Sequence, residues 1–137
     1  TRELGITFVA YSPLARGLLT GTIRHEDDLA PDDWRRNVPR FQGANLAHNV
    51  ALLAPLEQVA ARHGTTAPTV AVAWLLTRGD DVVPLVGMGR PRSVERALEA
   101  EQVMLSADDL AALDAAFPIG AAAGLRYPEE MMSRVHV

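Results

Sequence analysis

The chain has 137 residues and no cysteine, so disulfides and thiol chemistry are excluded. Its formal net charge of −4 argues against a nucleic-acid surface. The hydrophobic fraction of 48% fits a globular protein, and no apolar run approaches the ~20 residues of a membrane span.

Residues 6–10 are predicted to form a buried strand, because the run is short, apolar and rich in β-branched and aromatic residues. Tyr11, Ser12 and Pro13 follow it, and Gly17 and Gly21 allow the next turns to approach a ligand closely. An aromatic side chain at the end of a strand can stack on a flat ring. A hydroxyl and a glycine-bearing loop can offer backbone N–H groups to an anion.

Residues 22–44 read as a long polar loop, which in a compact domain is usually functional or mobile. A helix is predicted from Asn45, a good N-cap, to a C-terminal cap at Gly64. Pro55 should kink or split that helix, because proline removes a backbone donor.

A second helix is predicted to begin after Thr66, with Pro68 in its first turn, and a second strand covers residues 82–87. A glycine-containing turn then leads into a helix from about residue 93 to residue 102. Ser106 and Asp109 approximate a capping box for a last helix. The order of elements predicts an α/β fold, a βαβα unit whose two strands are parallel.

Other chemistry finds little support in the sequence. Ser12 lacks the surroundings of a nucleophile elbow, which argues against a hydrolase. The histidines show neither helical metal-ligand spacing nor a cluster with other ligands, so no metal site is predicted; they are His25, His48, His63 and His136.

The segment from Tyr11 to Gly21, which reads YSPLARGLLTG, closely resembles the YSPL(G/A)xGxLTG segment of aldo-keto reductases. In that family it follows strand seven of a (β/α)8 barrel, and the rest of the chain continues to resemble the family. The resemblance implies the C-terminal portion of a (β/α)8 TIM barrel, strands seven and eight with their helices. Residues 1–137 would form a partial aldo-keto reductase domain, since a whole barrel needs roughly 250 residues.

The resemblance also implies a nicotinamide cofactor site. It places Tyr11 on the nicotinamide ring, and it places Ser12, Leu14, Arg16 and Gly17 at the pyrophosphate. Two alternatives stay open: Tyr11 as an aromatic on the rim that covers the barrel core, and Ser12 as a turn residue that ends a strand.

The turn after residues 84–87 resembles the adenosine-binding turn of the family, which would place six residues near the adenosine: Gly87, Met88, Gly89, Arg90, Ser93 and Arg96. The usual Glu-Asn pair is absent, because Arg96-Ala97 stands there. Arg90, Arg92 and Arg96 could instead bind a 2′-phosphate, or be solvated charges at the helix start. The cofactor is therefore expected to be NADP, with NAD possible.

The long loop resembles one that covers the substrate in the family, so Trp34 and Phe41 are candidate walls of the substrate pocket. The alternative is that both residues tether the loop to the barrel rim. Residues 124–127 resemble a tail motif of some family members.

The implied activity is hydride transfer in carbonyl reduction or alcohol oxidation, with a nicotinamide cofactor and a small carbonyl or alcohol substrate as partners. The family's Tyr, Asp, Lys and His tetrad precedes the matching segment, so no catalytic residue is assigned and the isolated chain is predicted to be inactive. The alternative is a non-catalytic fragment that acts only by binding or assembly. A cytoplasmic location without nucleic acid or membrane is expected, and the substrate, reaction direction and oligomeric state stay open.

Overall fold

The computed structural model describes residues 1–89 and 91–135. Two strands are present in this part of the chain, β1 (Phe8–Tyr11) and β2 (Val82–Leu85). The helices are α1 (Gly43–Ala51), α2 (Leu53–Arg62), α3 (Ala67–Leu76), α4 (Pro91–Glu99), α5 (Ala107–Ala116) and α6 (Glu129–Met132). Short 3-10 helices are η1 (Arg2–Leu4), η2 (Ala15–Thr20), η3 (Glu26–Asp28), η4 (Trp34–Asn37), η5 (Pro39–Phe41) and η6 (Ala100–Gln102).

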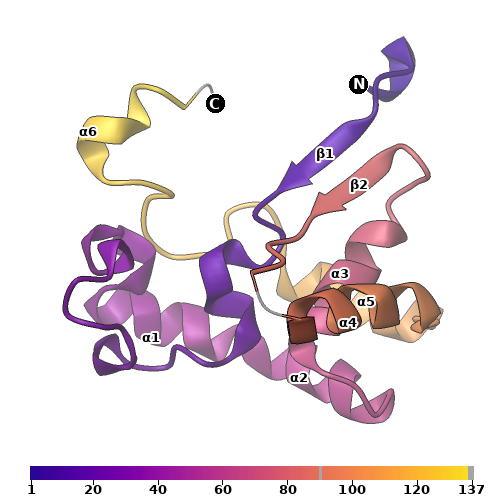
Figure 1. The fold of residues 1–137 in the computed structure, drawn as a ribbon, viewed down its shortest axis with the longest axis horizontal. Coiled ribbons are helices and arrows are strands. Elements are labelled where there is room, and N and C mark those ends of the chain that lie inside the picture. The colour runs from indigo at the N-terminus through magenta and orange to yellow at the C-terminus, as the bar shows by residue number, and fades with distance from the viewer. Residues whose placement is uncertain (90, 136–137) are drawn as a thin grey trace.

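The two strands pair in parallel, with Phe8 opposite Val82 and Tyr11 opposite Leu85. Helices α1 to α3 make the connection between them, and Figure 1 shows the strand pair extending away from the helices. The predicted parallel βαβα order is confirmed. The first strand lies at residues 8–11 rather than 6–10, so Tyr11 is its last residue.

The prediction that the first strand is buried is wrong for this chain. Only Ala10 of β1 is buried, whereas Phe8 is 50% and Val9 is 52% exposed. In β2, Val83 and Leu85 are about half exposed as well. The reason is that the described residues contain no third strand to pair with either edge.

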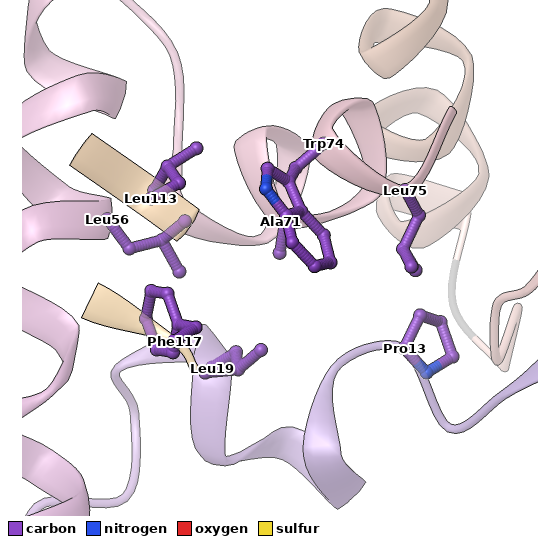
Figure 2. A pocket seen from close by; sticks show the side chains of 8 residues that line it. All are labelled: Pro13, Leu19, Leu56, Ala71, Trp74, Leu75, Leu113 and Phe117. Carbon is purple, nitrogen blue, oxygen red and sulfur yellow. The ribbon is translucent and has the colours of Figure 1, made fainter. Parts of the chain in front are cut away.

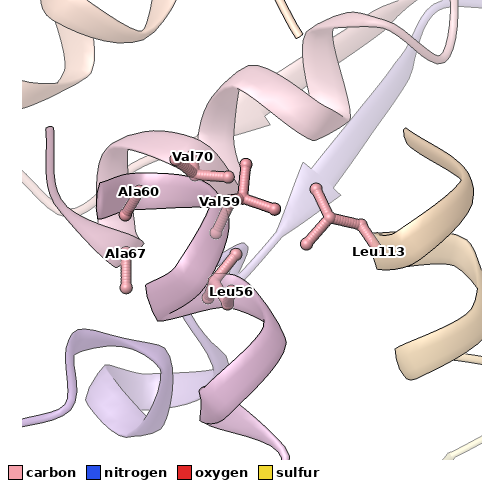
Figure 3. Close-up of a cluster of buried hydrophobic side chains, with 7 residues drawn as sticks. Leu56, Val59, Ala60, Ala67, Val70 and Leu113 are labelled. Carbon is pink, nitrogen blue, oxygen red and sulfur yellow. The ribbon is translucent and has the colours of Figure 1, made fainter. Parts of the chain in front are cut away.

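The main core lies between α2, α3 and α5. Figure 3 shows Val59 of α2, Val70 of α3 and Leu113 of α5 turned toward one another. Each of the three is at most 1% exposed, so the contact excludes water. Burial of such side chains contributes about 1.5–3 kcal/mol each, which makes this the principal stabilising contact of the helices.

Helix boundaries follow the predictions in part. The chain is split before Pro55, with α1 ending at Ala51 and Pro55 in the first turn of α2, where a missing N–H is tolerated. Gly64 has a left-handed φ of 62° and follows α2 as predicted.

The N-cap prediction at Asn45 is wrong, because α1 begins at Gly43 and the Asn45 side chain donates to the Pro39 carbonyl. Helix α4 begins at Pro91, two residues before the predicted start.

The segment predicted as an irregular loop has a small core of its own. Ile23, Leu29, Val38 and Phe41 are each at most 4% exposed and form a cluster that includes Leu46 of α1. Phe41 lies in η5, and Leu29 and Val38 directly follow η3 and η4. The segment is therefore a packed part of the fold rather than a solvated excursion.

The C-terminal tail turns back over the molecule. Helix α6, which the sequence pattern did not predict, lies on the side where the chain passes through residues 26–41, as Figure 1 shows. None of the helices within residues 1–89 and 91–135 combines the length and the apolar character that crossing a membrane requires.

Asp109 links α5 to the end of α2. Its carboxylate accepts hydrogen bonds from His63 Nε2 at 2.8 Å, Arg62 Nη2 at 2.6 Å and the Ser106 hydroxyl at 2.7 Å. The Asp109 N–H returns a bond to Ser106 Oγ, which completes the predicted capping box. These donors, His63 foremost, hold the pKa of Asp109 well below its usual range.

Asp109→Asn should lower the free energy of unfolding by about 2 kcal/mol, because the amide loses the charge that His63 and Arg62 face. As the pH falls below ~4, the unfolded chain takes up the proton before the folded chain does. The difference between the two proteins should therefore be full at neutral pH and shrink below about pH 4.

Urea unfolding at pH 7 and pH 3 measures this difference. Asp108→Asn is the matched control, since Asp108 is exposed in the same first turn of α5. An equal loss for both variants at pH 7 would contradict a specific role of Asp109.

Candidate functional site

The turn that follows β1 has an unusual backbone. Three non-glycine residues have left-handed φ angles, 55° at Ser12, 48° at Ala15 and 60° at Arg16, and Gly17 follows at 94°. The Ser12 carbonyl accepts the Ala15 N–H at 2.9 Å and its hydroxyl accepts the Arg16 N–H at 3.2 Å. Strain of this kind costs about 1–3 kcal/mol per residue and gathers at ligand clamps and active sites.

Gly17 suits its position, because residues with side chains rarely adopt its φ of 94°. A Cβ there would lie 3.0 Å from Nη1 of Arg35, which donates to the Arg16 carbonyl at 2.9 Å. Arg35 forms a salt bridge with Asp33. The hydrogen bonds from Arg35 lower the pKa of Asp33 to about 2. The turn after β1 and the segment around η4 are therefore fixed to each other.

A hollow of about 280 Å³ opens beside this turn. It joins three of the predicted site residues, Tyr11, Ser12 and Arg16, to Phe41 of η5. The ring of Tyr11 is 69% exposed and available for stacking. We call this space the arginine hollow, because its lining includes three arginines, Arg16, Arg40 and Arg126.

The two candidate walls of the substrate pocket differ in position. Phe41 is 1% exposed, packs in the small core and borders the arginine hollow. Trp34 is 53% exposed and does not line the hollow. It lies against Arg16, whose guanidinium carbon is 5.2 Å from the centre of the indole.

The tail residues 124–127 meet the same turn. The Arg16 guanidinium stacks on Tyr127, 4.1 Å from the ring centre, and Nη1 of Arg16 donates to the Arg126 carbonyl at 2.6 Å. Arg16 thus lies between Trp34 of η4 and Tyr127 of the tail.

Asn49 holds the tail in place and was missed by the sequence analysis. This side chain is 1% exposed, and its amide donates to the Arg40 and Ala123 carbonyls, each at 3.0 Å. Its carbonyl oxygen accepts the Ala123 N–H at 2.8 Å. A signal existed, because Asn49 stands three residues after Leu46 and so on the apolar face of its helix.

A second, smaller hollow of about 80 Å³ joins the turn after β1 to the start of α4. The predicted site residues that line it are Leu14, Gly87, Ser93 and Arg96. We call it the Leu14–Arg96 hollow. Met88 is 54% exposed and, like Gly17 and Gly89, lines neither hollow. The predicted position of Arg90 lies outside the described residues.

The third space is an apolar pocket of about 140 Å³, shown in Figure 2. From the segment between Tyr11 and Gly17, only Pro13 lines this pocket. The other lining side chains belong to the helices and their core. Titratable side chains are absent from its lining, which consists of Pro13, Leu19, Leu56, Ala71, Trp74, Leu75, Leu113 and Phe117. This pocket could therefore bind an apolar group, but it offers no acid, base or charged group for a reaction.

Among residues 1–89 and 91–135, no group of three or more His, Asp or Glu side chains could hold a metal ion. The candidate chemistry of the described surface therefore rests on arginines, hydroxyls and aromatic rings around the two hollows.

Comparison with known proteins gives consistent results. The model of the Aldo/keto reductase family matches residues 1–117. The chain is 37% identical over 112 residues to "Aldo-keto reductase str7" of Strobilurus tenacellus, covering 82% of this chain and 33% of that protein. It is 36% identical over 134 residues to "Aldo-keto reductase yakc [NADP(+)]" of Schizosaccharomyces pombe, covering 98% and 39%.

A solved structure, the glycerol dehydrogenase AKR11B4 from Gluconobacter oxydans, superposes with a TM-score of 0.76 at 27% identity. The match covers 90% of this chain and 38% of that chain. The chain thus spans between 33% and 39% of the length of these relatives. The predicted fold class, part of a (β/α)8 barrel, is confirmed.

Asn49→Ala should free the tail, because the carbonyls of Arg40 and Ala123 and the N–H of Ala123 all lose their partner. We expect a loss of about 2 kcal/mol in the free energy of unfolding. The amide of Ala123 should also exchange with solvent at least tenfold faster, since an opened tail loses this protection.

Hydrogen exchange followed by mass spectrometry over residues 118–127 measures the second effect. Gln42→Ala is the control, because Gln42 stands directly before the same helix and its amide donates to the Arg36 carbonyl rather than to the tail. Unchanged exchange in Asn49→Ala would show that the tail is held by other contacts.

Proposed function

The chain belongs to the aldo/keto reductase family, and from that premise we propose that it carries the C-terminal cofactor-binding part of an NADP(H)-dependent oxidoreductase. Residues 1–137 would form a partial aldo-keto reductase domain, corresponding to strands seven and eight with their helices. The reaction is carbonyl reduction or alcohol oxidation by hydride transfer. The observation that carries the proposal is the Leu14–Arg96 hollow, which joins the two segments expected at the cofactor.

The turn after β1 suits the nicotinamide and pyrophosphate ends of the cofactor. The exposed ring of Tyr11 would stack on the nicotinamide. Ser12, Leu14, Arg16 and Gly17 would lie at the pyrophosphate, since successive N–H groups in such a left-handed turn can form an anion-binding nest.

The turn after β2 suits the adenosine end. Gly87, Ser93 and Arg96 line the hollow directly. Ser93 lies in the first turn of α4, where N–H groups have no helical partner and the helix dipole favours an anion. Further proposed contacts of the adenosine are Met88, Gly89 and Arg90.

When bound, the nicotinamide supplies or accepts the hydride. The residues of this chain would position the cofactor and border the substrate. Phe41 offers an apolar wall beside Tyr11 in the arginine hollow, and Trp34 supports Arg16 from outside. The proposed substrate is a small carbonyl compound or alcohol.

The proton donor of the reaction is proposed to come from outside these residues. The chain holds two tyrosines and no lysine. Tyr127 is engaged with the guanidinium of Arg16, and Tyr11 stands at the proposed nicotinamide position. The 137 residues alone are therefore expected to transfer no hydride.

A second candidate is a non-catalytic barrel fragment that acts only by binding or assembly. The two candidates differ in the length of the encoding reading frame, which an enzyme would extend by the rest of a barrel of roughly 250 residues.

Tyr11→Ala in the full-length protein should raise the dissociation constant of NADPH several-fold, since aromatic stacking contributes ~1 kcal/mol beyond area burial. Hydride transfer should slow as well, because the nicotinamide loses the surface that orients it. Quenching of NADPH fluorescence measures the affinity, and single-turnover kinetics measure the transfer.

Tyr11→Phe is the control, because it keeps the ring and should keep the affinity for NADPH. Unchanged binding and rate in Tyr11→Ala would mean that Tyr11 only covers the rim.

Arg96→Gln should lower the affinity for NADPH by about tenfold and leave the affinity for NADH nearly unchanged, since a charge-assisted bond to the 2′-phosphate contributes ~1.5–3 kcal/mol. Titration with each cofactor measures the ratio. Arg134→Gln is the control, because it removes the same charge at an exposed position outside both hollows. Equal losses for NADPH and NADH would identify Arg96 as a general support of the site.

A further inference from the structure

The arginine hollow gathers positive charge from three separate segments. Arg16 comes from the turn after β1, Arg40 from η5 and Arg126 from the tail. The burial of Arg40 lowers its pKa, and the charges of Arg126 and Arg16 lower it further. The fold therefore places like charges together at a cost that a ligand of opposite charge would relieve.

Neutral groups, rather than carboxylates, hold the side chains of Arg16 and Arg40. Arg16 donates to the Arg126 carbonyl, and Nε of Arg40 donates to the Gly124 carbonyl at 3.3 Å. In the part of the chain that the structure describes, none of the three forms a salt bridge, whereas Arg35 pairs with Asp33 and Arg62 pairs with Asp109.

The hollow is also built as a site. The Asn49 amide fixes the backbone of Arg40 and of the tail, and Trp34 and Tyr127 hold the Arg16 side chain between them. Ser12 adds a hydroxyl to the lining. The Arg16 guanidinium is thus positioned beforehand, which limits the entropy lost when a ligand binds.

We propose that the arginine hollow binds an anionic group of the substrate, a carboxylate or a phosphate ester, so that the parent enzyme acts on small carbonyl compounds or alcohols that carry a negative charge. The inference rests on the proposed function, because Tyr11 borders this hollow and is also the proposed platform of the nicotinamide. An anion held by the arginines would place the reactive carbon of a short substrate over that platform.

The cofactor's own phosphates are the other source of such a charge. The Leu14–Arg96 hollow, with Ser93 at the start of α4, provides a separate place for them. Arg16 is also proposed at the pyrophosphate, whereas Arg40 and Arg126 come from η5 and the tail, outside the segments expected at the cofactor. The substrate is therefore the better match for the arginine hollow.

The test measures binding by calorimetry at constant ionic strength in the protein at its full natural length, with and without saturating NADPH. The probes are succinate, its neutral isostere succinamide, and inorganic phosphate. Succinate or phosphate should bind saturably in the presence of NADPH, and succinamide should bind at least about tenfold more weakly than succinate. The tighter of the two anions identifies the charged group as carboxylate or phosphate.

Arg40→Gln and Arg126→Gln should each lower the affinity for the anion about tenfold. Arg134→Gln is the control, because it removes the same charge outside the hollow, and it should change this affinity less than twofold. Arg126 is exposed, so its variant keeps the test valid if Arg40→Gln fails to fold. Equal losses in all three variants, or equal affinities for succinate and succinamide, would overturn the proposal.

Competition between NADPH and succinate would also overturn it, because the hollow would then belong to the cofactor phosphates. Succinate binding that survives without any NADPH binding would contradict the proposed function and would support the anion site alone.

Discussion

The parallel pairing of β1 with β2 is the constraint on which the candidate site depends. Tyr11 and Leu85 are the last residues of their strands and lie opposite each other. The turns that leave the two strands must therefore start from the same edge of the sheet, as they do in any parallel pair. This is why Leu14, from the first turn, shares a hollow with Gly87 and Ser93, from the second. An antiparallel pair would have sent the two turns to opposite ends.

A second constraint is the buried amide of Asn49, which sets the other side of the site. Its hydrogen bonds tie η5 and the tail to α1, so that Arg40 and Arg126 meet the turn after β1. Such an amide is stabilising only when its partners are all in place, because unpaired polar groups are costly inside a protein. The tail, although distant in sequence, is thereby part of the same unit as the loop.

Local signals in the sequence predicted the local structure well. The capping box at Ser106, the split before Pro55 and the left-handed turn at Gly64 all formed where the residue types predicted them. Each depends on chemistry within a few residues, which a sequence displays directly. The family resemblance carried the rest, since the YSPL-type segment predicted a barrel fold that composition alone could not specify.

Errors arose where distant contacts decide. The strand predicted as buried is half exposed, because its burial depends on neighbours that no local pattern supplies. Phe41, expected on a loop, lies in a core that forms only when η3, η4 and η5 fold together. The arginine hollow was invisible in the sequence for the same reason, as its three arginines come from segments that only the tertiary structure unites.

A crystal structure of the full-length protein with NADP bound is the most direct test of the proposed cofactor role of this chain. The result expected is a nicotinamide ring stacked on Tyr11, with the adenosine phosphates beside Leu14 and Ser93. A cofactor bound elsewhere, with both hollows free of it, would contradict the claim.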